Sequence, residues 1–113
     1  MKRFLLLFLL ASCTTIEYTD LRGEWHSTDA FLPFAESVTL DITESEVAVI
    51  ADNEEVGRGG YTIDRGQAIM GWSVDMRSIP IVLYDATMTA DDRLLLRWKP
   101  IDYYYNFTTQ FER

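Results

Sequence analysis

The chain has 113 residues, with 18 acidic and 10 basic side chains and a formal net charge of −8. This length fits one domain with one modest core. The acidic balance argues against nucleic-acid binding and against charge-driven attachment to an anionic membrane. A single cysteine excludes a disulfide within the chain, so stability has to come from packing.

Residues 1–12 have the layout of a secretory signal. Lys2 and Arg3 give a positive start, an apolar run follows, and small residues precede Cys13. At about 1.5 Å per residue, the run is too short to cross a hydrocarbon core of about 30 Å. We expect the signal to be removed, which leaves the mature chain more acidic by two charges.

The tetrad LASC at residues 10–13 resembles the lipobox of bacterial lipoproteins. The resemblance implies cleavage before Cys13, a diacylglycerol on its sulfur and acylation of the new amino group, which together give stable membrane attachment. Thr14 stands where an Asp tends to retain such proteins at the inner membrane. The expected location is the cell envelope, lipid-anchored, and the outer membrane in a Gram-negative cell. The alternative is an ordinary signal cut near Ser12, with Cys13 as a thiol prone to oxidation.

Residues 13–20 contain the lipidated cysteine and a short polar tether, and a pattern of period two begins at Leu21. Residues 37–43, for example, alternate Val38, Leu40 and Ile42 with polar side chains, as a half-buried strand does. Further strand-like runs cover 46–52, 60–64, 67–76, 80–89, 94–100 and 103–113, with turns expected at 53–55, 64–66 and 89–93.

Strands at this spacing predict an all-β domain over residues 21–113, a small antiparallel meander barrel of six to eight strands. A closed barrel suits a membrane-tethered protein, because it has no edge strands that could pair with those of neighbouring molecules on the membrane. The glycines of GRGG at 57–60 mark a bulge, a barrel corner or a close approach of another group, and we favour a corner. A phosphate loop is disfavoured, because the GxxxxGK[ST] layout is missing.

The segment LRGEW places Gly23 and Trp25 in a G-x-W motif that resembles the first strand of the lipocalin and wider calycin families. GRGGYTIDRGQAI, VLYDATMTADDRLLLRW and YNFTTQFER then follow in an order similar to small lipocalin-like domains of bacterial lipoproteins. The resemblance covers most of residues 21–113. It implies an antiparallel barrel in which Trp25 closes one end, stacked under a late arginine such as Arg97 or Arg113. The chain is short for a full eight-stranded cup.

No catalytic, metal or cofactor site is predicted. His26 is the single histidine, and its neighbour Ser27 would point to the opposite face of a strand, out of reach of a base. The acidic stretches at 52–55 and 91–92 lack the spacing of a calcium loop, and zinc would need more histidine or cysteine. We therefore do not expect an enzyme.

The aromatic side chains are the candidate binding residues. Trp72, Trp98, Tyr103, Tyr104 and Tyr105 offer a large apolar area for so small a domain. Most of it should fill the core. The alternative is that some of these rings line a pocket mouth or an exposed patch, because in a strand Tyr104 must face away from Tyr103 and Tyr105.

These observations predict a membrane-anchored binding or interaction module. It would hold a small apolar or amphipathic ligand, or a cell-envelope protein, at the barrel mouth and its aromatic rim. The alternative is a surface-exposed inhibitor of the protease type or a host-interaction protein, which would use residues 14–20 or 27–36 to reach its target.

Overall fold

The computed structural model describes residues 18–28 and 35–113, which form nine antiparallel strands after a short helix, α2 (Tyr18–Leu21). The strands are β1 (Gly23–Ser27), β2 (Val38–Ile42), β3 (Glu46–Ala51), β4 (Glu54–Gly60), β5 (Thr62–Asp64), β6 (Gln67–Met76), β7 (Ile79–Met88), β8 (Leu94–Pro100) and β9 (Phe107–Glu112).

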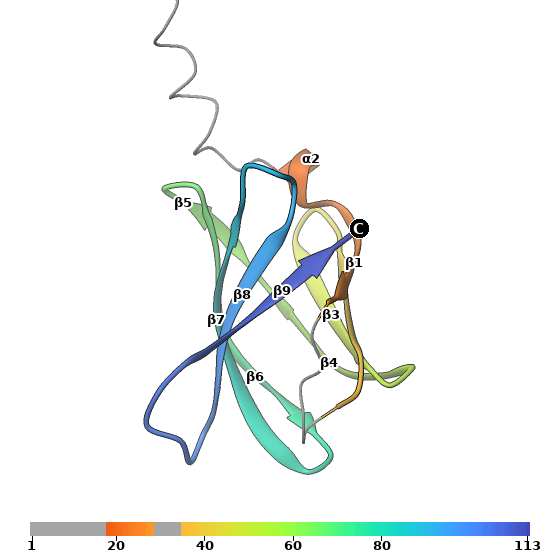
Figure 1. The fold of residues 1–113 in the computed structure, drawn as a ribbon, viewed down its shortest axis with the longest axis vertical. Coiled ribbons are helices and arrows are strands. Elements are labelled where there is room, and N and C mark those ends of the chain that lie inside the picture. Colours follow the sequence, from red (N-terminus) through yellow and green to blue (C-terminus); the bar gives the residue numbers. More distant parts are fainter. Residues whose placement is uncertain (1–17, 29–34) are drawn as a thin grey trace, which may run out of the picture.

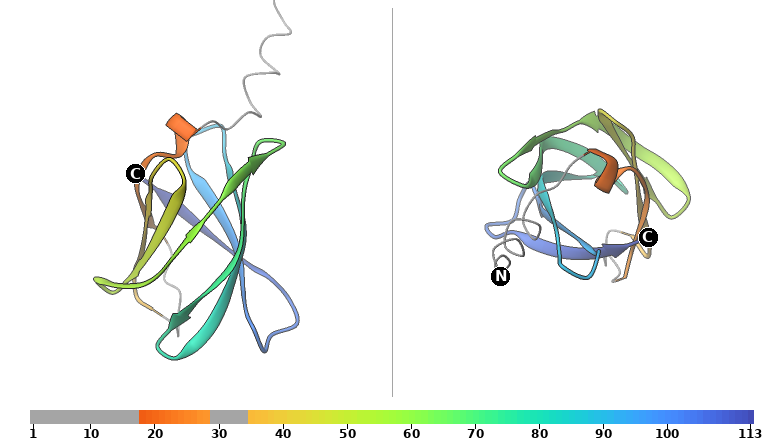
Figure 2. Two further views of the ribbon diagram at one scale, coloured as in Figure 1. Left: turned by 180° about the vertical axis from the view of Figure 1, so that it is seen from behind. Right: turned by 90° about the horizontal axis from the view of Figure 1, so that it is seen from above.

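The strands form one sheet in the order β4-β3-β2-β1-β9-β8-β7-β6-β5. The sheet curls on itself until β4 packs against β6, and seen from above it forms a ring (Figures 1 and 2). Strand β1 completes the meander by pairing with β9, where Ser27 faces Phe111. The prediction of an all-β antiparallel barrel is confirmed, and the barrel is nearly closed.

The predicted count of six to eight strands is wrong, because the region from residue 52 to residue 64 contains two strands. The turn expected at 53–55 lies one residue earlier, at Asp52 and Asn53, whose positive φ angles suit a two-residue hairpin. Strand β4 therefore starts at Glu54. It is separated from β5 by Tyr61, which is buried and donates its hydroxyl to the Thr43 carbonyl at 2.7 Å.

The core lies inside the barrel and consists of the inward side of the alternating strands. Val38, Leu40 and Ile42 are buried as predicted. In β8 the alternation likewise buries Leu94, Leu96 and Trp98. The largest fully buried side chains are Trp25, Phe111, Leu21, Leu40, Ile42, Met76, Ile81, Leu83, Leu94, Leu96 and Val38.

Two glycines of GRGG serve a close approach of two strands, which was one of the three interpretations, and the run ends where the chain passes from pairing with β3 to pairing with β6. Gly57 and Gly59 lie within β4, against β6. A Cβ on Gly57 would come within 2.3 Å of Val74, and a Cβ on Gly59 within 2.5 Å of the Trp72 ring. Neither position has space for a side chain, so these glycines allow the barrel to close.

The predicted closing strand is shorter than expected. Strand β9 begins at Phe107, and its buried residues are Thr109 and Phe111, as the alternation predicted. Tyr103, Tyr104 and Tyr105 instead lie in the loop that joins β8 to β9. The chain turns there because Pro100 ends β8 and its carbonyl accepts a hydrogen bond from Tyr103 N at 3.0 Å.

The barrel has two distinct ends. Helix α2 lies at one of them, beside the C-terminus of the chain (Figure 1). The β3–β4 hairpin, the β6–β7 hairpin and the β8–β9 loop lie at the opposite end, here called the far end (Figures 1 and 2). Among the described residues, no helix has the length and apolar character needed to span a bilayer.

Candidate functional site

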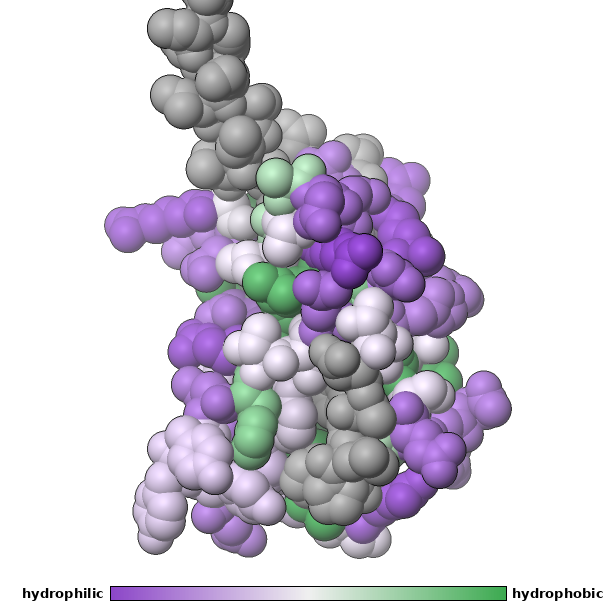
Figure 3. Space-filling view, in the orientation of Figure 1, coloured by the Kyte–Doolittle hydropathy of each residue, from purple (hydrophilic) through white to green (hydrophobic). Residues whose placement is uncertain are grey.

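The candidate site is a group of exposed apolar and aromatic side chains at the far end, here called the aromatic tip. Four of its residues belong to the β8–β9 loop and one to the β6–β7 hairpin. Their exposed fractions are 100% for Tyr104, 63% for Tyr105, 49% for Ile101, 41% for Tyr103 and 38% for Ile79. In Figure 3 the surface that protrudes over this loop is pale, whereas strongly hydrophilic surface lies near the α2 end and along the opposite, right-hand edge of the view.

The loop is held in place by the side chain of Lys99. Its Nζ donates to the carbonyls of Pro100 at 3.2 Å, Ile101 at 3.1 Å and Tyr103 at 2.8 Å. All three donors of the ammonium group are thus used on the loop backbone. The loop is also joined to the neighbouring hairpin, because Ile101 N donates to the Pro80 carbonyl at 3.1 Å.

A series of ring contacts connects the aromatic tip to the core. Tyr103 and Tyr105 each contact Phe107, with ring centroids 5.8 and 5.4 Å apart, and they lie 6.2 Å from each other. Phe107 stacks on Trp98 at 4.9 Å. These distances suit favourable aromatic pairs. The exposed tyrosines therefore have a packed base, and Tyr104, which makes none of these contacts, projects beyond it.

The two tryptophans predicted as binding residues lie away from the tip surface. Trp98 is buried and donates Nε1 to Thr109 Oγ1 at 2.9 Å. Trp72 is partly buried in the seam between β4 and β6, where its Nε1 donates to the Gly60 carbonyl at 2.7 Å. Of the five predicted binding residues, the structure brings Tyr103, Tyr104 and Tyr105 together.

Sequence reasoning missed three contributors to the aromatic tip: Ile79, Ile101 and the supporting Lys99. One signal was available for the loop, since PIDYYYN at 100–106 has a proline, an aspartate and an asparagine around the tyrosines, which is typical of a turn. No such signal marks Ile79, which joins the tip only because the β6–β7 hairpin lies beside the loop.

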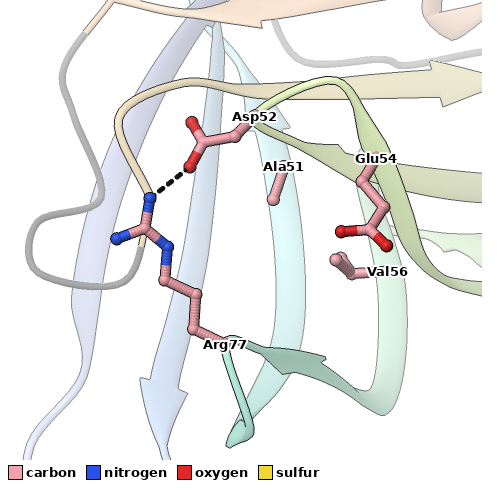
Figure 4. Close-up of a pocket in the computed structure, with 5 residues that line it drawn as sticks. All are labelled: Ala51, Asp52, Glu54, Val56 and Arg77. Carbon is pink, nitrogen blue, oxygen red and sulfur yellow. Dashed lines mark hydrogen bonds and ion pairs between the residues drawn. The ribbon is translucent and has the colours of Figure 1, made fainter.

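A second feature of the far end is a pocket of about 210 Å³ lined by Ala51, Asp52, Glu54, Val56 and Arg77 (Figure 4). Arg77 Nη2 donates to Asp52 Oδ2 at 2.6 Å. The other carboxylate oxygen of Asp52 accepts from Glu36 N and Ser37 N at 3.0 Å each. The hydrogen bond from Ser37, followed by that from Arg77, lowers the pKa of Asp52 below its ordinary value.

Asp52 therefore links two hairpins to the segment before β2, which is a structural role. None of the predicted aromatic binding residues lines this pocket.

The structure gives His26 no catalytic neighbourhood among the described residues. Its Nδ1 lies 3.1 Å from Thr39 Oγ1, and its Nε2 lies 3.8 Å from a carboxylate oxygen of the exposed Glu24. Ser27 Oγ accepts from Val38 N at 3.1 Å. Within residues 18–28 and 35–113, no three His, Cys, Asp or Glu side chains are grouped as metal ligands would be.

The G-x-W motif lies at the α2 end. Trp25 is fully buried and donates Nε1 to the Leu21 carbonyl at 2.8 Å. The guanidinium of Arg113 lies over its ring, 4.0 Å from the centroid. Of the two arginines that the family resemblance offered, Arg113 takes this position. Arg97 instead donates to Asp85 at 2.5 Å and lies over Tyr84.

The described fold is thus an all-antiparallel, nearly closed β-barrel, compatible with a lipocalin-like fold. Comparison of the chain with protein-family models, with curated proteins and with solved structures gave no significant match. The predicted signal, Cys13 and most of the tether lie outside the described residues, as do residues 29–34 of the segment predicted for the inhibitor alternative.

Proposed function

We propose that this protein is a membrane-anchored interaction module of the cell envelope. In this proposal Cys13 carries the lipid, the barrel is a lipocalin-like domain, and the aromatic tip binds a protein partner. One observation carries the proposal: Tyr104 and its neighbours are exposed in a loop whose backbone is fixed by Lys99. Aromatic side chains on a preorganised loop suit binding, because little conformational entropy is lost when a partner covers them.

A protein partner is better supported than a small ligand inside the barrel. The inward side of the described strands is occupied by packed side chains, including Trp25, Trp98 and Phe111. The pocket at the far end is lined by an ion pair and a further carboxylate, which is poor chemistry for an apolar ligand. The aromatic tip, by contrast, has the residue types that are enriched at the centre of protein interfaces.

The position of the tip also supports the proposal. Helix α2 includes the last residues of the predicted tether and lies at the end of the barrel opposite the aromatic tip (Figure 1). A lipid on Cys13 would be attached to the chain a few residues before α2. The aromatic tip would then lie at the end of the barrel that is farther from the membrane attachment point. A partner in the aqueous part of the envelope could then reach it.

The test is crosslinking in the cell. A photoreactive amino acid at position 104 of the full chain should form an adduct with one protein, identified by mass spectrometry. The same group at position 64, on the exposed Asp64 of β5, is the matched control and should not form that adduct. Absence of a position-specific adduct would count against a protein partner. Native mass spectrometry of the purified protein then tests the ligand alternative, which requires a bound apolar molecule.

Lipid anchoring has its own test. Cys13→Ser should move the protein from the membrane fraction to the soluble fraction, and mass spectrometry of the natural protein should find acyl chains on Cys13. An unmodified Cys13 thiol would overturn this part of the proposal and leave the rest untouched.

A further inference from the structure

The charges around the aromatic tip indicate the chemistry of its partner. We propose that the tip recognises a basic segment of a partner protein, whose Lys or Arg side chains lie over the tyrosine rings and pair with Asp102 and Asp75. This inference rests on the proposed function, because it assigns a chemical class to the partner of the same surface.

The first observation is that the cations at the far end are already used. The Lys99 ammonium donates to three loop carbonyls, and Arg77 is held by Asp52 at 2.6 Å. If Lys99 paired with an acidic partner, the loop would lose the hydrogen bonds to its carbonyls. If Arg77 did so, the β6–β7 hairpin would lose its ion pair with Asp52. The far end therefore offers an acidic partner few free cationic donors.

The second observation is that carboxylates beside the tip remain available. Asp102 is exposed within the loop, between Ile101 and Tyr103. Asp75 is exposed on β6 and pairs with Pro80, whose carbonyl accepts the hydrogen bond from Ile101 N. Within residues 18–28 and 35–113, neither carboxylate takes part in an ion pair. The tip is thus flanked by negative charge on two sides.

The tyrosine rings reinforce this preference for cations. The face of an aromatic ring carries negative electrostatic potential and attracts ammonium and guanidinium groups. Tyr104 is wholly exposed and Tyr105 largely so, which leaves ring surface accessible to such groups. The net charge of −8 would also speed the approach of a basic partner and repel an acidic one.

In the experiment, the full chain is solubilised in detergent and immobilised. Peptides that bind it are then selected from a phage library of random sequences. Clones that bind the wild type and are lost with Tyr104→Ala are sequenced. We expect enrichment of Lys and Arg next to apolar residues. A selected peptide should lose about threefold in affinity with Asp102→Asn or Asp75→Asn and about tenfold with Tyr104→Ala. Raising NaCl from about 0.05 to about 0.5 M should weaken binding further.

Asp64→Asn is the control, because it removes an exposed carboxylate at the α2 end and should leave affinity unchanged. Peptides that depend on Tyr104 but are acidic or uncharged would overturn the basic-partner inference and leave the proposed function standing. If the selection yields no Tyr104-dependent peptide, and crosslinking at position 104 also finds no protein, the proposed function itself fails.

Discussion

Arg113 Cζ lies 4.0 Å from the centroid of the Trp25 ring, so an arginine that follows strand β9 covers the buried tryptophan of strand β1. The same guanidinium donates Nη1 to the Arg22 carbonyl at 2.8 Å and Nη2 to the Asp20 carbonyl. Trp25 in turn donates to the Leu21 carbonyl. Together the two side chains satisfy backbone carbonyls at the end of α2 and fix the helix to the α2 end of the barrel.

We predict that Arg113→Ala lowers the free energy of unfolding by about 1 to 2 kcal/mol, since it removes a cation–π contact and hydrogen bonds to two carbonyls. Arg113→Lys should recover only part of the loss, because an ammonium group lacks the planar fork that reaches both carbonyls. Urea denaturation measures the change. The control is Arg22→Ala, which removes an exposed arginine beside the same helix; an equal loss there would contradict a specific role for Arg113.

The seam between β4 and β6 gives a second prediction. A Cβ on Gly59 would lie 2.5 Å from the Trp72 ring, whereas a Cβ on Gly60 would meet nothing closer than the Ser45 carbonyl oxygen at 3.6 Å. Gly59→Ala should therefore destabilise the barrel by about 2 kcal/mol, and Gly60→Ala should stay within about 0.5 kcal/mol of wild type. Thermal unfolding of the two variants, measured side by side, tests this prediction. Equal stability of Gly59→Ala and Gly60→Ala would show that β4 and β6 are not closely packed at Gly59.

The sequence predicted the fold class well because alternation of period two is a direct consequence of strand geometry. Val38, Leu40 and Ile42 are the clearest case. It failed on the strand count, because the break at Tyr61 depends on a hydrogen bond to Thr43 from a different hairpin. The sequence offered close approach as one reason for the glycines of β4, but it could not identify the neighbours, because Val74 and Trp72 come from β6.

The candidate site was predictable in composition but not in shape. The three consecutive tyrosines drew attention to residues 103–105, yet a strand was expected there. The loop forms because the side chain of Lys99 satisfies its carbonyls, a contact that residue spacing does not reveal. Trp72 and Trp98 were grouped with the tyrosines by residue type alone. Their indole nitrogens instead form hydrogen bonds within the barrel.

Lys99→Met should loosen the aromatic tip without unfolding the barrel, because it keeps the aliphatic part of the side chain and removes the donors to three carbonyls. We expect faster hydrogen exchange of the backbone amides at residues 101–105 and a loss of less than about 1 kcal/mol in global stability. Exchange measured by mass spectrometry is the readout. Arg93→Met, at the other end of β8, should leave those amides unchanged; unaltered exchange in Lys99→Met would show that the loop does not depend on this side chain.

Asp52 gives a prediction on acid stability. Its pKa is lowered in the folded protein, first by the hydrogen bond from Ser37 N and then by Arg77, so the folded state binds this proton less readily than the unfolded chain. Its stabilising contribution is complete above the ordinary carboxyl pKa and is lost as the pH falls through the lower, folded-state pKa. Wild type should lose stability between about pH 5 and about pH 3 more steeply than Asp52→Asn, which should itself be less stable at neutral pH.

Urea denaturation across this pH range tests the difference in slope between wild type and Asp52→Asn. Asp64→Asn is the matched control, because Asp64 is exposed and takes part in none of the ion pairs among the described residues, and this variant should keep the wild-type slope. Parallel curves for wild type and Asp52→Asn would show that the link between the two hairpins does not contribute to acid stability.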